Sequence, residues 1–430
     1  MGRTSIRTLL AVQVLFCIAG SACAGGSVSA DASDSAYADS VYRWLVAQQM
    51  PTGILGNQEN EYFSGLYTNA LAAICYMHQG DLARAENIFS FFEGHLDSVA
   101  KVPPGGYTQF WDAMTGQPYL DTDRWVGDNA WLLIALNHHY RATKEDRYAE
   151  MRRTIAQWLI SLQDVDGGIK SGFNQDGLMF WKSTEGNLDC YAALTEYPEQ
   201  RQKIETFLRD QMWVPHEGRF RMGSTVAESA LDTCSWGVAA LGTDYAAALR
   251  YAERTFLCTY TSDATGVNIT GFSDFVSRER IWLEGTGEMV VAYQVAGHHD
   301  KAQSYLQELD RAMMPSARFG RLVGLPCFTN APAWPTGSTQ IFVPSQAWYL
   351  FGAWQFNPMQ AACDCPQVAD INGDRIVNLL DFSRLAQSWL LAEPSVDISP
   401  SPAGDGVVNA HNLMSLAECW LMTIAPVIER

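Results

Sequence analysis

Six acidic residues stand near the start of strongly apolar segments, where paired carboxyl groups could act as a general acid and a general base. They are Asp128, Glu185, Asp189, Asp232, Glu284 and Glu288. Glu185 with Asp189, and Glu284 with Glu288, are four residues apart and would share one face of a helix. Two carboxyl groups can donate and accept a proton in one reaction only where their surroundings separate their pKa values. The fold must therefore bring these acids to one place.

Helix capping is the alternative explanation for each of these acids. Asp and Glu favour the first helical turn because they interact with the positive end of the helix dipole. The string at residues 183–186, Ser-Thr-Glu-Gly, also fits an N-terminal cap with no catalytic duty. We expect at least two of the six acids to be catalytic, led by Asp128, Glu185 and Glu284. The first assignment is Glu284 as the acid and Asp128 or Glu185 as the base.

The elements that would position these acids are helices. Twelve segments between Asp31 and Asn357 have apolar residues at helical spacing, and they alternate between two kinds. One kind is apolar almost all round and belongs inside a fold, whereas the other has a charged face and belongs outside. The inner segments start at Phe63, Asp123, Trp181, Val226, Arg280 and Gln340. Their regular recurrence predicts an all-α domain at residues 31–357, a closed ring of six helical hairpins.

Long connections lead into the inner segments, and short ones lead out. The long connections are rich in Gly, Pro, Trp and Asp, as in "KVPPGGYTQFWDAMTGQPYLDTD". Long loops in a compact domain are usually functional. All of them would lie at the end of the ring where the inner helices begin, together with the six acids.

This alternation, with "GDNAW", "TEGNLD" and "WLEGTGE" opening three inner segments, resembles the six-hairpin glycosidase superfamily. The resemblance implies an (α/α)6 toroid that hydrolyses glycosidic bonds of a polysaccharide or oligosaccharide with acids at its mouth. Such a cleavage needs a protonated carboxyl for the leaving oxygen and an ionised one to activate water or attack the sugar. The sugar, the linkage, the choice of endo or exo attack and the stereochemical outcome stay open.

Tryptophans crowd the same connections. They are Trp111, Trp125, Trp181, Trp282 and Trp334. We expect them to stack on sugar rings, because large aromatic faces are seldom left in water without a binding role. Packing between helices is the alternative for each one. Gly285 and Gly287 beside the acids of one segment would leave room for a ligand to approach the backbone.

A calcium-binding loop is predicted near the far end of the chain. Side-chain oxygens and one backbone carbonyl stand at loop positions 1, 3, 5, 7, 9 and 12, on Asp370, Asn372, Asp374, Ile376, Asn378 and Asp381. A solvated acidic turn is the alternative, and Arg375 replaces the glycine that position 6 favours. The loop and its following helix, duplicated, resemble a type I dockerin at residues 370–423 after a linker at 358–369. The resemblance implies Ca²⁺ and a cohesin-type scaffold partner, although the repeat could serve as a C-terminal cap.

The second copy of this loop is degenerate. Asp405, Gly406, Asn409 and Asn412 fit positions 5, 6, 9 and 12. Without a gap, positions 1 and 3 fall on Ser401 and Ala403, which bind calcium poorly. Asp397 would be the first ligand only if the loop carries an insertion.

Residues 1–24 are typical of a secretory signal peptide, with Arg3 and Arg7 before an apolar run and a small-residue cleavage site. We therefore expect an extracellular or periplasmic protein, and anchoring as a lipoprotein through Cys23 is the alternative. The formal net charge of −18 disfavours nucleic acid and anionic membrane as partners. We expect Cys75, Cys190 and Cys234 to be buried free thiols, and a bridge from Cys363 or Cys365 to Cys419 is plausible.

Other functions are also compatible with a helical toroid of this kind. A polysaccharide lyase on a related toroid would need a base and a cation, for which Tyr67, Tyr107 and Arg124 are the candidates. The acidic mouth would repel the anionic polymer that a lyase cleaves. A non-catalytic sugar-binding protein would use the tryptophans alone. A sugar epimerase or a terpene cyclase also uses a helical toroid, but the export signal argues against either role.

Overall fold

The computed structural model describes residues 37–119, 122–330, 337–360, 369–372, 377–393, 395–398, 406–409, 412–413 and 416. The chain divides into two units, one of residues Ser33–Ala361 and one of Ala362–Arg430 with Met1–Ala32. The predicted signal peptide at 1–24 and the cysteines at 363, 365 and 419 lie outside the described residues. No helix among the described residues is long and apolar enough to cross a bilayer.

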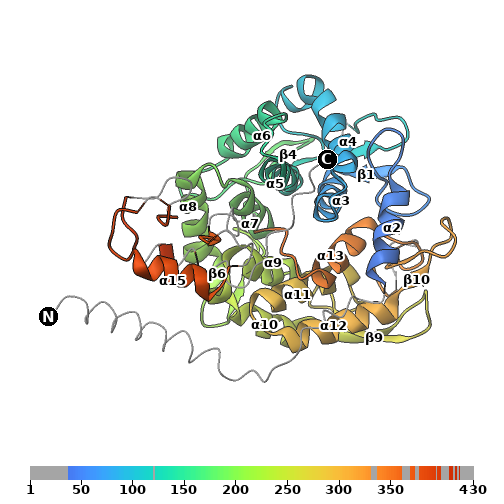
Figure 1. The fold of residues 1–430 in the computed structure, drawn as a ribbon. Helices are drawn as coiled ribbons and strands as arrows, with labels where there is room; N and C mark the ends of the chain where they lie inside the picture. Colours follow the sequence, from blue (N-terminus) through green and yellow to red (C-terminus); the bar gives the residue numbers. More distant parts are fainter. Residues whose placement is uncertain are drawn as a thin grey trace. The chain divides into compact units, whose positions relative to one another are not determined.

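Six inner helices of the larger unit form a closed ring (Figure 1). They are α3 (Leu66–His78), α5 (Val126–Thr143), α7 (Thr184–Ala193), α9 (Leu231–Leu241), α11 (Leu283–Val295) and α13 (Val343–Ala353). Each packs on the next, and α13 packs on α3. Nearly every side chain of these helices is buried, as in α5, where all residues from Val126 to His139 are inaccessible or almost so. The sequence segments that are apolar all round are therefore the inner helices.

Outer helices surround this ring in the larger unit (Figure 1). They are α2 (Ala38–Gln48), α4 (Leu82–Gly94), α6 (Ala149–Ser161), α8 (Pro198–Phe207), α10 (Ala247–Thr255) and α12 (His299–Ala312). The helices from α4 to α12 each pack on the inner helix before them, and α2 packs on α13. Each of the twelve predicted segments is helical, and the predicted alternation of inner and outer helices is confirmed. Short π-helical turns follow α4 and α8 at Leu96–Ala100 and Leu208–Met212, and a 3₁₀ turn at Thr243–Tyr245 precedes α10.

Short antiparallel strands fill the long connections, a feature that the all-α prediction lacked. The pairs are β1 (Phe63–Gly65) with β2 (Phe110–Asp112), β6 (Trp213–Val214) with β7 (Arg219–Phe220), β8 (Leu257–Thr261) with β9 (Asn268–Phe272) and β10 (Met314–Pro315) with β11 (Val323–Gly324). A three-stranded sheet joins β3 (Arg124–Trp125), β4 (Gly172–Asn174) and β5 (Gly177–Met179). Most of these strands are only two or three residues long, so they leave no detectable alternation of apolar and polar residues.

Hydrogen bonds between neighbouring connections run all the way around one end of the ring. The connection before α3 pairs with the one before α5 through β1 and β2, which in turn pairs with the one before α7 through β3 and β4. Isolated backbone pairings continue the circle at Ser183–Gly223, Trp282–Phe328 and Gln58–Phe342. The N–H of Leu231, which donates to the backbone carbonyl of Asp274, completes it. This continuous support fixes the first turn of every inner helix.

The fourth residue of most inner helices also ties its helix to the preceding connection. In α5, Asn129 accepts a hydrogen bond from the N–H of Tyr107 at 2.8 Å, and its amide donates to two backbone carbonyls. In α7, Asn187 accepts from the N–H of Ile169 at 2.7 Å in the same way. The equivalent residues in α3, α11 and α13 are Asn69, Thr286 and Gln346. Cys234 takes this position in α9.

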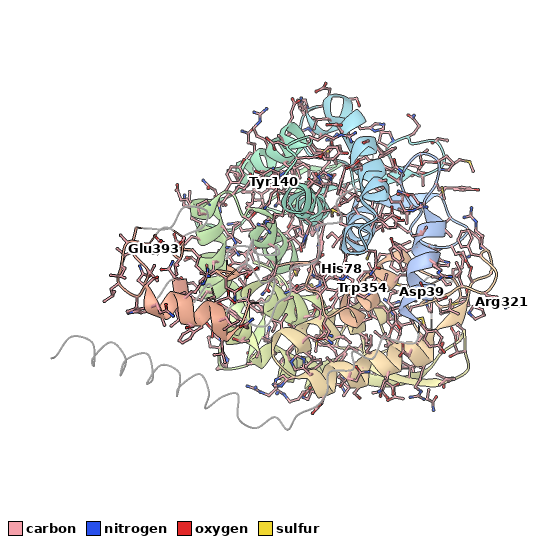
Figure 2. The ribbon with its side chains drawn as sticks, viewed as in Figure 1. Asp39, His78, Tyr140, Arg321, Trp354 and Glu393 are labelled. Carbon is pink, nitrogen blue, oxygen red and sulfur yellow. The ribbon has the colours of Figure 1, made fainter. Side chains whose placement is uncertain are left out.

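The other end of the ring is covered by the segment that follows α13. Trp354 stacks on His78 with ring centroids 4.6 Å apart, and Figure 2 labels both residues. Farther along this segment, His138 bonds the carbonyl oxygen of Pro358 at 2.9 Å, and Asn357 donates to a carbonyl of α9. The connections and the acids therefore lie at the opposite end from this cover. The buried free thiols Cys75, Cys190 and Cys234 are confirmed.

The smaller unit has its own hydrophobic cluster. It comprises Ala369, Val377, Leu385, Val396, Ile398, Val408 and Leu416. Helix α15 (Leu379–Gln387) begins after Asn378, whose side chain forms a capping box with Asp381. Residues from both predicted loop-and-helix copies thus share one core, which is what a folded duplicated module requires.

Candidate active site

Four of the six acids lie in the first turns of four successive inner helices. Asp128 is the third residue of α5, and Glu185, Asp232 and Glu284 are the second residues of α7, α9 and α11. The carboxyl groups lie close enough for Asp232, Asp128 and Glu284 each to raise the pKa of Glu185. Residues up to 156 positions apart in the sequence therefore converge at one end of the ring.

The other two acids lie one turn deeper on the same helices. Asp189 follows Glu185 on α7, and Glu288 follows Glu284 on α11. Both side chains are buried, Asp189 completely. Neither oxygen of Asp189 accepts a hydrogen bond from the described residues, and Glu288 accepts one, from Ser235 Oγ at 2.8 Å. Burial raises the pKa of both groups well above its usual value, and the acids above them raise it further.

Tyr67, the second residue of α3, links two of the upper acids. Its backbone N–H donates to Asp128 Oδ1 at 3.3 Å, and its hydroxyl donates to Glu284 Oε1 at 2.9 Å. The indole N–H of Trp348 donates to that hydroxyl at 2.7 Å, so the one proton of Tyr67 is directed at Glu284. Gln109 donates to the other oxygen of Asp128 at 3.1 Å. The sequence suggested Tyr67 only as a lyase base.

Glu185 has different surroundings from Asp128 and Glu284. None of the described residues donates a hydrogen bond to its carboxyl group, and the residue as a whole is partly exposed. Burial raises the pKa of Glu185 well above its usual value, and the carboxylate of Asp232 is the next largest cause. Hydrogen bonds to a carboxylate stabilise the ionised form. The structure therefore favours a protonated Glu185 beside acids that are more easily ionised.

The pKa values of the other upper acids are spread over a range around neutrality. Burial raises the pKa of Asp232 to about 6, that of Asp128 to about 7 and that of Glu284 to about 8. Hydrogen bonds from Tyr67 oppose this rise at Asp128 and at Glu284. Among the described residues, no cation contributes to these shifts. The cluster therefore holds protonated and ionised carboxyl groups together at neutral pH, as general acid–base catalysis requires.

Aromatic side chains line the connections around the acids. Trp125 and Trp181 pack together with ring centroids 5.4 Å apart and are both partly exposed. Trp282 directly precedes α11, and its indole lies near enough to lower the pKa of Glu284. Phe180 and Phe275, in the connections that lead to α7 and α11, are 73% and 51% exposed. These rings supply flat apolar surface beside the carboxyl groups.

Trp111 is a correction to the predicted sugar-binding set. It is fully buried, its indole N–H donates to the carbonyl of Thr108, and its ring packs against Phe91, Phe92 and His95. A side chain with no accessible surface cannot stack on a ligand, so packing is its role. Trp334 lies outside the described residues.

The glycines of α11 serve packing rather than ligand access, contrary to expectation. A Cβ atom on Gly285 would lie 2.3 Å from the ring of Trp282, and one on Gly287 would lie 3.0 Å from the backbone of Trp348. Both positions are already filled by protein atoms. Close approach of α11 to α13 explains the second glycine.

Two of the candidate lyase residues are structural. Tyr107 is buried and donates its hydroxyl to the carbonyl of Phe92 at 2.7 Å. Arg124 donates to the carbonyls of Val99, Gly105 and Gly106. Neither side chain is directed to the acid cluster. Arg124, the candidate cation that a lyase would use to neutralise a uronate, binds backbone carbonyls instead.

Three tryptophans close the ring beneath the acids. Trp131 and Trp236 lie with ring centroids 5.5 Å apart, and Trp348 stacks on Trp236 at 5.9 Å. The indole N–H groups of Trp131 and Trp236 make no hydrogen bond of ordinary geometry among the described residues, although Trp131 lies near enough to lower the pKa of Asp189. This apolar base excludes water from one side of the acids and accounts for their raised pKa values.

Within the described residues, no group of three or more His, Cys, Asp or Glu side chains is arranged to hold a metal ion. Of the predicted calcium loop, Asp370, Asn372, Asn378 and Asp381 are described, whereas Asp374 and Ile376 lie outside. Asp381 is buried and accepts the backbone N–H groups of Asn372 and Asn378, each at 2.9 Å.

The fold is shared with sugar-processing proteins of known structure. No family model and no curated protein matches the chain. A glycosidase is 14% identical with a TM-score of 0.55, covering 78% of this chain and 100% of that chain. A sugar epimerase from a ruminal bacterium is 13% identical with a TM-score of 0.53, covering 73% of this chain and 96% of that one. A family 76 glycoside hydrolase from a bovine Bacteroides thetaiotaomicron strain is 13% identical with a TM-score of 0.51, covering 75% and 77%.

At these identities the likeness establishes the fold, a toroid of helical hairpins. It does not choose a reaction, since hydrolase and epimerase structures are among the matches. The chemistry must be argued from the acids and their surroundings.

We expect Asp189→Asn to stabilise the protein at neutral and alkaline pH. The folded chain holds a proton on Asp189 that the unfolded chain gives up above its ordinary pKa of 3.8, so the wild type loses stability as pH rises above that value. Asparagine removes this loss. Thermal unfolding at pH 8 and at pH 3 measures the effect, which should be present at pH 8 and absent at pH 3. Equal midpoints for variant and wild type at pH 8 would contradict it.

Proposed function

We propose that the protein is a glycoside hydrolase that cleaves a polysaccharide or oligosaccharide at the end of the ring where the six acids lie. The convergence of Glu185, Glu284 and Asp128, in surroundings that separate their ionisation, carries this proposal. Hydrolysis of a glycosidic bond needs this combination of a proton donor and an ionised carboxylate. The aromatic rings in the connections suit sugar faces, and the shared toroid fold supports the same class of substrate.

In this proposal Glu185 is the general acid, whereas the sequence led us to expect Glu284 in that role. A group that donates a proton must be protonated before the reaction, and Glu185 has no donor to stabilise its anion while Asp232 disfavours ionisation. Its proton goes to the glycosidic oxygen as the bond to the anomeric carbon breaks. Asp232 acts through Glu185, as a positioning residue that keeps it protonated.

Glu284 is then the ionised partner at pH values above its pKa of about 8, and Asp128, with a pKa of about 7, is the alternative. Glu284 accepts the hydroxyl of Tyr67, and Asp128 accepts one backbone and one side-chain N–H, all of which favour the anions. The Glu284 carboxylate takes a proton from the attacking water or attacks the anomeric carbon itself. Released sugar anomers, followed as they form, distinguish these two routes.

The test of this function is a screen of the secreted chain on neutral and acidic glycans. We expect new reducing ends from neutral glycans and no unsaturated sugar products. Unsaturated products would instead establish the lyase reaction. Binding of glycans without cleavage, unchanged by Glu185→Gln and Glu284→Gln, would establish a sugar-binding protein.

Tyr67→Phe should move the acid side of the pH–rate profile to higher pH. Activity requires ionised Glu284 and therefore falls as pH drops through the pKa of about 8. Loss of a hydrogen bond to a charged group costs about 1.5 kcal/mol, which corresponds to roughly one pKa unit. The pH dependence of kcat/KM measures this shift. Tyr107→Phe is the matched control, because its hydroxyl bonds a carbonyl away from the acids; equal profiles for the two variants would contradict the role of Tyr67.

Trp181→Ala and Trp111→Ala should separate sugar binding from packing. We expect Trp181→Ala to raise KM roughly tenfold, equivalent to about 1.4 kcal/mol of binding, with little change in stability. Trp111→Ala should instead lower the free energy of unfolding by about 3–5 kcal/mol, because it leaves a large cavity. Steady-state kinetics and denaturant unfolding of both variants measure the contrast. Equal loss of stability in the two would contradict a binding role for Trp181.

We also propose that the smaller unit is a calcium-stabilised docking module of an exported protein. Asp370, Asn372, Asn378 and Asp381 supply the oxygen donors that Ca²⁺ prefers, and the packed core of the unit suits a folded module. Bound Ca²⁺ would neutralise the acidic loop and hold it to the start of α15. A cohesin-type scaffold and export by residues 1–24 rest on the sequence resemblance, and pull-down by a cohesin panel tests the first of these.

A further inference from the structure

Three aromatic side chains form a continuous apolar surface on a small sheet beside the acids, and none of them belongs to the predicted sugar-binding set. The rings of Phe63 in β1 and Phe110 in β2 lie with centroids 4.3 Å apart and planes tilted by 31°. The ring of Tyr119 packs on Phe63 at 5.6 Å. These three rings are termed the aromatic platform.

The aromatic platform lies on the solvent face of this sheet. β1 pairs with β2, and the N–H of Tyr119 donates to the carbonyl of Phe110 at 3.0 Å, which adds a third segment to the sheet. Successive side chains of a strand point to opposite faces. Ser64 and Trp111 are buried, whereas Phe63 and Phe110, one position away on each strand, are partly exposed. Tyr119 is 37% exposed, so the platform is turned away from the core that holds Trp111.

The aromatic platform is next to the acids along β2. The side chain of Gln109, the residue before Phe110, donates to Asp128 Oδ2 at 3.1 Å. The backbone carbonyl of Gln109 accepts the N–H of Leu66, which begins α3, at 2.9 Å. Gln109 thus stands between the platform and the acids. A sugar ring on the platform would therefore belong to a unit beside the one that the acids attack.

Asp112 adds a hydrogen-bond acceptor to the edge of the aromatic platform. It lies directly opposite Phe63 in the pairing of β1 with β2, so the two side chains share one face. Asp112 Oδ1 accepts the backbone N–H groups of Thr115 and Met114 at 2.8 and 2.9 Å. The N–H of Thr115 is the largest cause that holds the pKa of Asp112 below its usual value. The group is therefore ionised at neutral pH and can only accept hydrogen bonds.

This combination matches the chemistry of a neutral sugar. A pyranose ring presents an apolar face of C–H groups, surrounded by hydroxyl groups that can donate hydrogen bonds. The aromatic platform suits the face, and the Asp112 carboxylate suits a hydroxyl. A uronate would instead be repelled by this carboxylate. Exposed apolar surface that continues a ligand site is typical of a binding surface.

We infer that the aromatic platform and Asp112 bind a neutral sugar unit outside the point of cleavage, so that the enzyme favours long chains over short oligosaccharides. This inference rests on the proposed hydrolase function and names its class of substrate, a neutral glycan several units long. The platform adds binding to a chain only when the chain extends beyond the acids. Chain length is therefore the variable that reveals it.

The test compares kcat/KM on linear oligosaccharides, from disaccharide to hexasaccharide, of cellulose, unsubstituted xylan, mannan and starch. For the wild type we expect kcat/KM to rise with chain length. Phe110→Ala and Tyr119→Ala should each lower the ratio of kcat/KM on the hexasaccharide to that on the shortest cleaved substrate roughly tenfold, because one stacked ring is lost. Tyr37→Ala is the matched control, since Tyr37 is equally exposed, at 37%, but precedes α2 outside the connections.

Two outcomes of this comparison would overturn the inference. One is a wild-type kcat/KM that does not change with chain length. The other is an unchanged ratio in Tyr119→Ala, which includes an equal loss on every substrate and would mean that the platform only packs. Tyr119 is at the edge of the sheet, so its variant decides the matter even where Phe110→Ala fails to fold.

An absence of cleavage would count against the proposed hydrolase function and not against the aromatic platform. Calorimetric titration of wild type and Tyr119→Ala with the same hexasaccharides then decides. Binding that is roughly tenfold weaker in Tyr119→Ala would support the platform. Equal affinities, or no binding of any hexasaccharide by the wild type, would overturn it.

Discussion

Glu185→Gln is expected to lower kcat/KM on a polysaccharide by about 10²–10⁴-fold, the usual contribution of a general acid. Glutamine keeps the shape of the side chain but has no proton to give to the leaving oxygen. Since no described residue bonds this carboxyl group, the substitution disrupts no hydrogen bond that supports the fold. Steady-state kinetics on the glycan identified by the screen measure the loss.

The leaving group provides the control for this result. The acidic phenol of an activated aryl glycoside leaves as a phenolate and needs no proton. Glu185→Gln should therefore retain most of the wild-type activity on that substrate. In the Glu185→Gln variant, the fall of kcat/KM at alkaline pH should also disappear, because this fall reports the ionisation of the general acid. Equal losses on both substrates would contradict the assignment of Glu185 as the proton donor.

The ring of hairpins could be predicted from the sequence because the signal repeats. Each inner helix is apolar all round and each outer helix has a charged face, so burial is visible in composition alone. The connections were less predictable. Their strands are mostly two or three residues long and are stabilised by pairing with connections far away in sequence, such as β3 with β4. Pairing of this kind leaves no periodic pattern in the chain.

The candidate acids could be found from their place at the start of inner helices, but their roles could not. Roles depend on hydrogen bonds between distant residues, such as Tyr67 with Glu284, 217 positions apart. The sequence does contain one signal that points to Tyr67. Aligning the inner helices on their fourth residue, Asn129 in α5 and Asn187 in α7, places an acid or Tyr67 at the second position of four of them. That alignment brings Tyr67 into the site from sequence alone.

Trp111 shows why spacing alone misassigns aromatic residues. It stands in a long connection, as Trp125 and Trp181 do, yet its side chain points into a cluster of aromatic rings beneath β2. Residues on alternate faces of a short strand differ in burial, and the direction is set by the pairing partner. Here Trp111 pairs with Ser64 of β1, which a single sequence does not reveal.

Glu284→Gln is expected to lower kcat/KM by a similar factor of about 10²–10⁴, but on the polysaccharide and the aryl glycoside alike. The ionised carboxylate acts at the anomeric carbon, and its contribution does not depend on the leaving group. The amide oxygen can still accept the hydroxyl of Tyr67, so the contact to Trp348 through Tyr67 is preserved. A loss confined to the polysaccharide would mean that Glu284 is the acid after all.

Asp128→Asn is the matched comparison for Glu284→Gln. Asp128 shares Tyr67 with Glu284 but bonds it through the backbone N–H, and Gln109 holds its other oxygen. If Glu284 is the ionised partner, Asp128→Asn should reduce activity less than Glu284→Gln on both substrates. It should also lower the pKa of Glu185, because the Asp128 carboxylate helps to keep that group protonated, and the alkaline side of the pH profile should move to lower pH. A larger loss for Asp128→Asn, with Glu284→Gln near wild type, would transfer the role to Asp128.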